Sequence, residues 1–191
     1  MNRILFVCTG NTCRSPLAEA MMRKLASDYQ ITLEVRSAGV AAVSGGPASR
    51  HSQTVMKERG LPSEHQSQAL SRELVEWADM VLTMTMGHKQ RIVQLFPGAV
   101  DKVHTLKEYV EDDDRALQAL VEKEHLISEI QLKQALSQPI TESDRIRVLE
   151  LERKSPSPDI ADPFGGTLED YRICAGELEN ALQKLLKKLQ K

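Results

Sequence analysis

A short polar loop at residues 8–15 (Cys-Thr-Gly-Asn-Thr-Cys-Arg-Ser) joins an apolar segment to a helix-like one. Residues 4–7 (Ile-Leu-Phe-Val) predict a buried parallel strand. Residues 15–29 predict a helix with Pro16 in its first turn, where a missing N–H costs little. A strand that enters a helix through such a loop points backbone N–H groups and the positive end of the helix dipole at one place. The loop therefore predicts a site for an anion.

The residue types in this loop fit phosphoryl transfer to a thiolate. The loop N–H groups and the helix N-terminus favour the thiolate of Cys8, the candidate nucleophile. Arg14, six positions later, has a planar fork of donors for two phosphate oxygens. Gly10 permits close backbone approach, Asn11 tolerates left-handed angles, and the Ser15 hydroxyl can bond the Cys8 sulfur. The competing interpretation is a buried structural cysteine near a surface arginine.

Residues 7–19 resemble the phosphate loop of the low-molecular-weight protein tyrosine phosphatases. Residues 36–39 (Arg-Ser-Ala-Gly) and 162–166 (Asp-Pro-Phe-Gly-Gly) extend the resemblance, which covers about residues 1–110 and 158–191. The cysteine precedes the acid segment, as in this small family and unlike the larger tyrosine phosphatases. The resemblance implies a phosphatase that acts on phosphorylated proteins through a cysteinyl-phosphate intermediate, without a cofactor. It implies that the loop binds the phosphate with Cys8, Thr9, Gly10, Asn11, Thr12, Cys13, Arg14 and Ser15.

The resemblance also carries the role of general acid onto Asp162. This carboxyl would protonate the leaving group and then accept a proton from the water that hydrolyses the intermediate. Asp159, three residues earlier and after a Pro/Ser-rich stretch at 155–158, is the other candidate for the general acid. The alternative is that Asp159 is a solvated carboxylate of the loop. Phe164 is predicted to form a wall of the substrate pocket or, alternatively, to anchor the loop in the core.

Thr12 carries the prediction about the substrate. The protein-arginine phosphatase subgroup of this family has Thr-Gly-Asn-Thr, as residues 9–12 do here, whereas members that act on phosphotyrosine usually have isoleucine or leucine in place of the last threonine. An apolar residue would leave guanidinium N–H groups unpaired, at a cost of about 1–3 kcal/mol. Residues 40–46 also lack the aromatic wall common in tyrosine-specific relatives. The sequence therefore predicts a protein-arginine phosphatase.

Three other functions stay open. The nearest is a protein tyrosine phosphatase in which Thr12 is a neutral substitution without effect on the choice of substrate. A thiol-dependent arsenate reductase shares the loop but needs further redox cysteines, and the chain has none between Cys13 and Cys174. The third is a non-catalytic phosphate-binding module.

Cysteine usage and charge limit the compartment and the partners. Family analogy predicts a protective Cys8–Cys13 disulfide, and the alternative for Cys13 is a small buried residue. Cys174 is expected to pack as a small hydrophobe. Three cysteines and an N-terminus unlike a signal peptide predict a cytoplasmic protein. A net charge of −2, histidines without ligand spacing and no long apolar run give no reason to expect nucleic acid, metal or membrane partners. Of the histidines, His65 is a candidate for contact with Asn11.

Strands and helices are predicted to alternate, with binding outside the carboxyl ends of the strands. The predicted fold is α/β, a three-layer sandwich with a central four-stranded parallel sheet, helices on both faces and an inserted helical hairpin. The strands are expected at 3–7, 32–36, 79–83 and 102–104, and the helices at 15–29, 47–59, 71–77, 86–95 and 167–190.

The inserted segment, about residues 111–157, departs from the family pattern inside a single domain of residues 1–191. A helix is predicted up to Gln138, Pro139 breaks it, and a second helix reaches about Arg153. The hairpin is either a surface elaboration or a lid or platform for a partner or a second copy. Its apolar residues are expected to bury against something: leucines and isoleucines at 117, 120, 126, 127, 130, 136, 146, 149 and 151. The insertion also leaves the mobility of Asp162 open, because it ends beside the acid segment.

Overall fold

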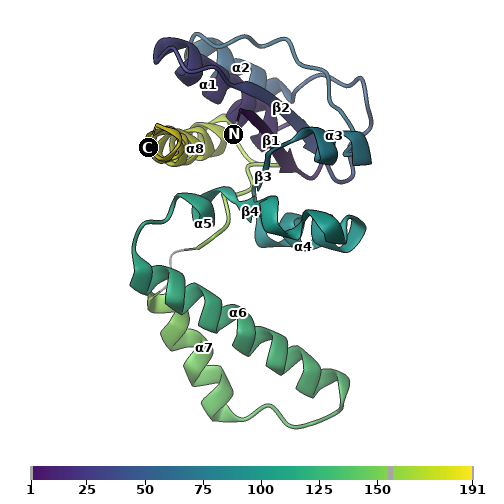
Figure 1. Cartoon of the computed structure of the whole chain (residues 1–191), viewed down its shortest axis with the longest axis vertical. Coiled ribbons are helices and arrows are strands. Elements are labelled where there is room, and N and C mark those ends of the chain that lie inside the picture. Colours follow the sequence, from purple (N-terminus) through teal and green to yellow (C-terminus); the bar gives the residue numbers. More distant parts are fainter. Residues whose placement is uncertain (1, 155–156, 191) are drawn as a thin grey trace. The chain divides into compact units, whose positions relative to one another are not determined.

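The computed structural model of the chain describes residues 2–154 and 157–190, so part of the Pro/Ser-rich stretch at 155–158 lies outside the described residues. Four strands form one parallel sheet in the order β2-β1-β3-β4 (Figure 1). Their bounds are Arg3–Cys8 for β1, Glu34–Gly39 for β2, Met80–Thr83 for β3 and Val103–Thr105 for β4. The predicted α/β class and its four strands are confirmed.

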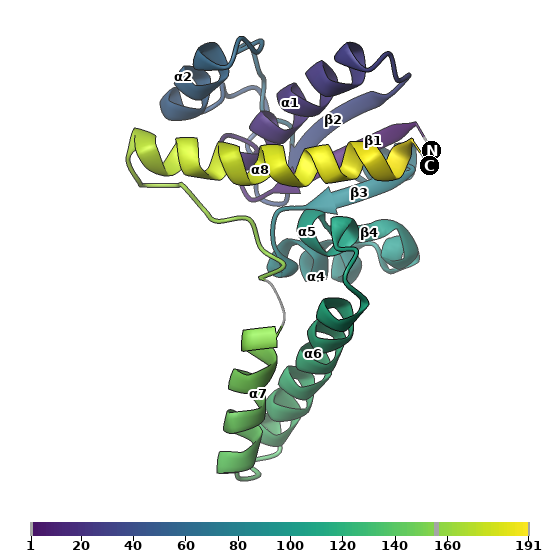
Figure 2. The same ribbon diagram turned by 90° about the vertical axis from the view of Figure 1, so that its left-hand side faces the viewer.

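Helices cover both faces of this sheet (Figures 1 and 2). Alternate side chains of β1 point to opposite sides because a strand has a period of two. Phe6 packs in one core with residues of α1, α2 and α8, and Val7 packs in a second core with residues of α3 and α4. The helices of this part of the chain are α1 (Arg14–Asp28), α2 (Arg50–Glu58), α3 (Arg72–Trp77), α4 (Met86–Leu95), α5 (Leu106–Val110) and α8 (Leu168–Leu189).

Two elements were not predicted from the sequence. The helix α5 has five residues, which is too short for a hydrophobic period to identify. A 3-10 helix, η1 (Pro97–Lys102), begins with a proline and a glycine, the residues that usually mark a turn. A smaller correction concerns Cys8, which was expected to be the first loop residue and is instead the last residue of β1, paired in register with Gly39.

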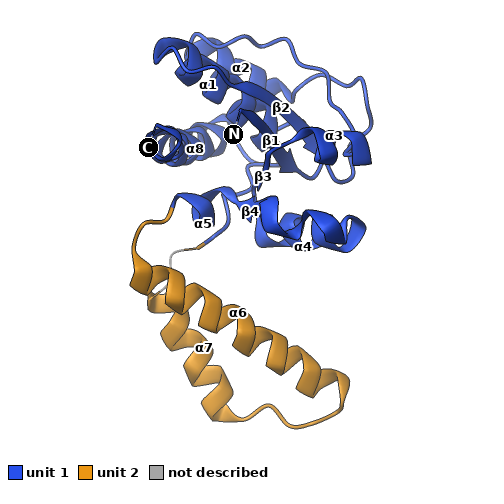
Figure 3. Ribbon diagram, in the orientation of Figure 1, with its two compact units in different colours: residues 1–110, 158–191 blue, residues 111–157 orange. Residues whose placement is uncertain are grey.

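The chain divides into two compact units, residues 1–110 with 158–191, and residues 111–157 (Figure 3). The second unit is a pair of helices, α6 (Asp114–Ala135) and α7 (Glu142–Lys154). An ion pair of 2.9 Å between Lys133 and Asp144 joins them. The sequence predicted that the first helix of the hairpin reaches residue 138, and α6 ends three residues earlier, at Ala135.

The expectation that the apolar residues of the hairpin all bury is wrong for part of the set. Leu120 and Leu151 are buried. Four others of the set stay exposed: Ile127, Leu136, Ile146 and Leu149. In the described part of the chain no helix is long and apolar enough to cross a membrane.

We expect the two faces of α8 to respond differently to truncation. Leu178 is fully buried, whereas Ile173 on the same helix is 61% exposed. Leu178→Ala should lower the free energy of unfolding by about 2–5 kcal/mol, because it leaves a cavity in the core. Ile173→Ala should change it by less than about 1 kcal/mol. Urea unfolding followed by circular dichroism measures both, and equal losses would contradict the assignment of the buried face.

Candidate active site

A pocket of about 280 Å³ lies over the loop between β1 and α1. Eight of the ten site residues predicted from the sequence line it: Cys8, Thr9, Gly10, Thr12, Cys13, Arg14, Asp162 and Phe164. The other two, Asn11 and Ser15, are completely buried. The structure thus brings together a loop at the N-terminus and an acidic segment about 150 positions later in the chain.

Cys8 lies at the carboxyl end of β1, and the loop that follows it leads into α1 at Arg14. Its sulfur is 3.0 Å from the hydroxyl oxygen of Ser15. A thiolate can only accept a hydrogen bond, so the Ser15 hydroxyl is the donor once Cys8 has lost its proton. The first N–H groups of α1 add a partial positive charge at this point, because they have no partner within the helix.

Arg14, the first residue of α1, is 4% exposed. It donates from Nη1 to the carbonyl oxygen of Ile160 at 3.2 Å and from Nη2 to Oδ2 of Asp162 at 2.8 Å. Its Nε is buried and has no hydrogen-bond partner among the described residues. A buried charged donor without a partner is costly, and Nε with a terminal nitrogen forms the fork that binds two oxygens of a phosphate. Arg14 is therefore suited to receive an oxyanion in the pocket.

The shape of the loop depends on Asn11, whose backbone is left-handed with φ 53°. Its side-chain nitrogen donates to Oγ of Ser15 at 2.9 Å and to Oγ of Ser37 at 2.8 Å. Its side-chain oxygen accepts from the backbone N–H of Gln68 at 2.8 Å, and its carbonyl accepts from Nε2 of His65 at 2.9 Å. These contacts satisfy both donors and the oxygen of a buried amide side chain and hold the loop in one conformation. The contact between His65 and Asn11 was the one proposed from the sequence.

Gly39 at the end of β2 lets this loop pack closely against the sheet. A Cβ at this position would lie 2.4 Å from the carbonyl oxygen of Thr9 and 2.8 Å from the backbone nitrogen of Asn11. Such distances are well inside van der Waals contact with backbone atoms. The segment 36–39 was predicted as part of the family pattern, and the structure supplies the steric reason for its glycine.

His88 supports the loop from α4 and was not predicted from the sequence, where a lone histidine in a helix carries no signal. Its Nε2 is 2.8 Å from Oγ1 of Thr9 and its Nδ1 is 2.8 Å from Oγ1 of Thr85. Burial and the nearby charge of Arg14 lower its pKa to about 4. The imidazole is therefore neutral at pH 7 and bridges the two threonines. In the described ranges no group of three or more His, Cys, Asp or Glu side chains is placed to hold a metal ion.

The two candidate acids have different surroundings. Asp162 lines the pocket with a half-exposed side chain, and its Oδ1 accepts from the N–H of Phe164 at 3.1 Å. Asp159 accepts from the N–H of Met86 at 2.7 Å, at the start of α4. Phe164 is 79% exposed and lines the pocket, so the alternative that it anchors the loop in the core is wrong.

The three cysteines are free thiols in this structure. Cys13 is buried, and its sulfur is 3.3 Å from the hydroxyl of Tyr171. The protective disulfide between Cys8 and Cys13 stays a prediction. Burial raises the pKa of the Cys174 thiol to about 12, which keeps it protonated inside the core. Tyr171 was not singled out in the sequence because its contact with the loop spans most of the chain.

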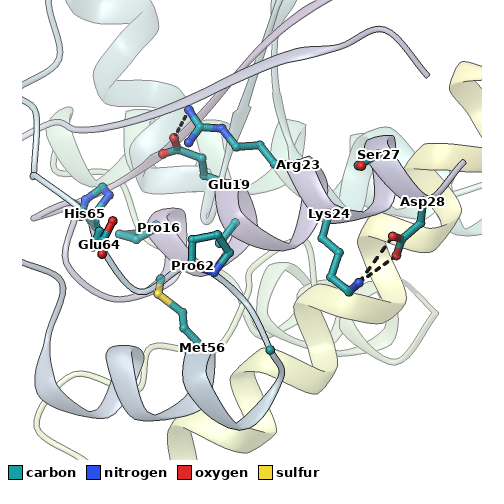
Figure 4. A pocket seen from close by; sticks show the side chains of 12 residues that line it. Pro16, Glu19, Arg23, Lys24, Ser27, Asp28, Met56, Pro62, Glu64 and His65 are labelled. Atoms are coloured by element: carbon teal, nitrogen blue, oxygen red, sulfur yellow. Dashed lines mark hydrogen bonds and ion pairs between the residues drawn. The ribbon is translucent and has the colours of Figure 1, made fainter. Parts of the chain in front are cut away.

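A second hollow, of about 340 Å³, lies between α1 and the segment 60–65 (Figure 4). Glu19 and His65 line it and also touch the network around Asn11, Glu19 through a hydrogen bond from Ser37. The hollow contains no cysteine, and its exposed side holds ordinary ion pairs such as that between Lys24 and Asp28. None of the described residues that line it also lines the pocket over the loop between β1 and α1.

We expect the imidazole of His88 to titrate with a midpoint near pH 4. An unfolded histidine binds its proton near pH 6.5, so protonation favours the unfolded chain between these values. The contribution to the free energy of unfolding is therefore complete above about pH 6.5 and falls as the pH drops towards 4. NMR titration of the ring nitrogens, with His88→Gln to assign the signal, measures the midpoint. A midpoint at or above pH 6 would contradict the proposed environment.

Comparison with known proteins supports this geometry. Residues 3–122 match the family model described as "Low molecular weight phosphotyrosine protein phosphatase". A protein-arginine-phosphatase of Geobacillus stearothermophilus is 40% identical over 98% of this chain and 96% of its own length. A low molecular weight protein-tyrosine-phosphatase, PtpB of Staphylococcus haemolyticus, is 40% identical over 96% of each chain.

A solved structure shows the same fold and is informative about the chemistry. It is a YwlE arginine phosphatase mutant with a phosphorylated active-site serine, 35% identical, with a TM-score of 0.75 over 99% of this chain and 96% of that one. Because the family model covers more than half of the chain and these relatives cover nearly all of it, the chain belongs to the low molecular weight phosphotyrosine protein phosphatase family.

Proposed function

We propose that this protein hydrolyses phosphoarginine on proteins through a cysteinyl-phosphate intermediate. One observation carries the proposal: Cys8, Asp162 and a buried Arg14 line one pocket, and Nε of Arg14 has no hydrogen-bond partner among the residues that the structure describes. A nucleophile, an acid and an oxyanion receptor are the three groups that phosphoryl transfer to a thiolate requires.

In the first step the thiolate of Cys8 attacks the phosphorus, and the bond from phosphorus to the arginine nitrogen breaks. Asp162 in its protonated form gives its proton to that nitrogen, so that the guanidinium leaves as a stable cation. Arg14 binds two phosphate oxygens with Nε and a terminal nitrogen and stays bound to them while the phosphoryl group moves.

In the second step water attacks the phosphorus of the cysteinyl-phosphate. The carboxylate of Asp162 takes a proton from the water, the phosphorus–sulfur bond breaks, and the Cys8 thiolate leaves with a hydrogen bond from Ser15. Phosphate is released. The phosphorylated serine of the related arginine phosphatase mutant is consistent with a covalent step at this position of the loop.

The choice of phosphoarginine rests on Thr12. This residue lines the pocket, and among the described residues its hydroxyl has one long contact, of 3.6 Å to the sulfur of Cys13. The hydroxyl is therefore available to a polar guanidinium, and the related protein-arginine-phosphatase supports this substrate. The equally identical tyrosine phosphatase makes phosphotyrosine the second candidate. The buried and protonated Cys174 gives no support to arsenate reduction, which needs an accessible thiol shuttle.

All of the pocket residues belong to residues 1–110 and 158–191. We therefore treat this unit as the catalytic part of one domain and residues 111–157 as an insertion in it. A reducing compartment, the cytoplasm, suits a thiol nucleophile. Phosphorylated proteins are the expected partners, and contact of a partner or a second copy with the hairpin stays a prediction.

The nucleophile is tested by Cys8→Ser. We expect turnover of p-nitrophenyl phosphate to fall by at least about a thousandfold, because the hydroxyl is a far weaker nucleophile at neutral pH. Calorimetry should still show binding of inorganic phosphate, since Arg14 and the loop N–H groups remain. Cys174→Ala, in the core of the same protein, should keep its activity. Turnover that survives Cys8→Ser would rule out the covalent mechanism. Absence of turnover from the unchanged protein would instead favour a non-catalytic phosphate-binding module.

The substrate is tested by Thr12→Ile, assayed on a phosphoarginine peptide and on a phosphotyrosine peptide. We expect kcat/KM for phosphoarginine to fall about tenfold or more, because guanidinium N–H groups lose a partner. Activity on phosphotyrosine should rise, because an apolar side chain packs on the phenyl ring. Thr12→Ser, which keeps the hydroxyl, is the matched control. An unchanged ratio would show that Thr12 does not select the substrate, and a clear preference of the unchanged enzyme for phosphotyrosine would favour the second candidate.

A further inference from the structure

The short segment before Asp162 is held by an ion pair that takes no part in the chemistry described above. Lys107 on α5 and Glu177 on α8 are 2.5 Å apart. Nζ of Lys107 also donates to the carbonyl oxygen of Asp159 at 3.0 Å, and the other carboxylate oxygen of Glu177 accepts from the N–H of Ala161 at 3.0 Å. The pair therefore binds the backbone on both sides of Ile160. We refer to Lys107 and Glu177 as the clamp.

Ile160 itself is fixed between the two points that the clamp holds. It is 1% exposed, its N–H donates to the carbonyl of Met84 at 2.8 Å, and its carbonyl accepts from Arg14 at 3.2 Å. The chain after Asp162 is different, because Phe164 is 79% exposed and Gly165 has a positive φ of 77°. Asp162 thus extends from a fixed base into a more open loop.

We propose that Lys107 and Glu177 are positioning residues for the acid of this enzyme. This inference rests on the proposed function, in which Asp162 protonates the leaving group. The clamp does not touch the Asp162 side chain and acts only through the backbone of residues 159–161. A general acid must lie within hydrogen-bond reach of the atom that it protonates, so a small displacement of its backbone lowers the rate of that proton transfer.

Because the clamp is partly buried, removal of either residue should leave its partners without a hydrogen bond or counter-ion. The side chains of Lys107 and Glu177 are 28% and 27% exposed, so both charges are partly shielded from water, whereas the hydrogen bond from Ala161 to Glu177 is exposed. Loss of Glu177 leaves the N–H of Ala161 without its acceptor and Lys107 without its counter-ion. Loss of Lys107 leaves the carbonyl of Asp159 without that donor. In each case the backbone is free to move towards new partners.

The clamp also lies where the chain leaves the catalytic unit and returns to it. Lys107 precedes the first residue of the insertion, Glu111, by four positions, and Asp159 follows its last residue, Ser157, by two. Both clamp residues and the backbone they bind belong to the catalytic unit. The clamp therefore ties the acid segment to α5 and α8 by contacts in which the inserted helices take no part. A long insertion next to the acid is compatible with a fixed acid for this reason.

The experiment compares two substrates that differ in their need for an acid. Phenyl phosphate has a basic leaving group that must depart protonated, whereas the leaving group of 2,4-dinitrophenyl phosphate departs without a proton. For Glu177→Ala and Lys107→Ala we expect kcat/KM for phenyl phosphate to fall about tenfold or more, and that for 2,4-dinitrophenyl phosphate to change by less than about twofold. The decline of kcat/KM for phenyl phosphate at alkaline pH should also weaken, because it reports the protonated acid.

Matched controls remove ion pairs of similar geometry elsewhere. Glu179 lies on the same helix as Glu177 and pairs with Arg59 at 2.6 Å, and Lys89 pairs with Glu108 at 2.8 Å. Glu179→Ala and Lys89→Ala should leave the ratio of the two substrates unchanged. Glu177→Gln keeps an oxygen for the N–H of Ala161 and should restore part of the lost activity on phenyl phosphate.

The outcomes separate the clamp from the proposed function. Equal losses on both substrates, or a ratio like that of Glu179→Ala, would overturn the positioning role. The ratio does not depend on the amount of folded enzyme, so a destabilised variant still decides the question. Asp162→Asn is the reference for the acid and should lose activity only on phenyl phosphate in kcat/KM. If Asp162→Asn shows no such selectivity, the assigned acid fails, whatever the clamp variants do.

Discussion

The site depends on one buried asparagine. Asn11 has a left-handed backbone, and its side chain bonds Ser15, Ser37 and the backbone of Gln68. These bonds join the loop after β1 to the end of β2 and to the segment before α3. Because a buried amide without partners costs free energy, the loop has a strong preference for this one arrangement. The curled loop then turns its N–H groups and the start of α1 towards the pocket, which makes the position of Cys8 suitable for a nucleophile.

Arg14 connects this loop to the acid. Its guanidinium is buried, and it donates to the carbonyl of Ile160 and to the carboxylate of Asp162. A buried cation needs such partners. These hydrogen bonds therefore stabilise the contact between residues 159–162 and the loop, although the two segments are far apart in the sequence. Lys107 and Glu177 hold the same segment from the other side. Arg14 and the proposed acid, Asp162, therefore share the contacts that position them, and the proposed phosphoryl transfer requires such preorganisation.

The second unit, residues 111–157, contributes none of the described residues that line the active-site pocket. Its two helices are joined by an ion pair between Lys133 and Asp144, and Leu151 is buried. Several apolar side chains on it remain exposed, among them Leu136 and Leu149. These exposed side chains are the basis of the expected contact with a partner or a second copy, which stays a prediction. The residues that line the active-site pocket and the two clamp residues belong to the other unit.

The sequence by itself determined the local parts of this protein. The order of the strands and main helices and the candidate nucleophilic loop follow from periodicity and residue types, because these signals are local. The proposed acid, Asp162, comes instead from the resemblance of residues 162–166 to the family. Only the tertiary structure decided which distant groups support them. The contacts of His88 with Thr9, of Tyr171 with Cys13 and of Glu177 with the acid segment join residues with no common motif. Such contacts arise when the core packs, and no pattern in the sequence encodes them by itself.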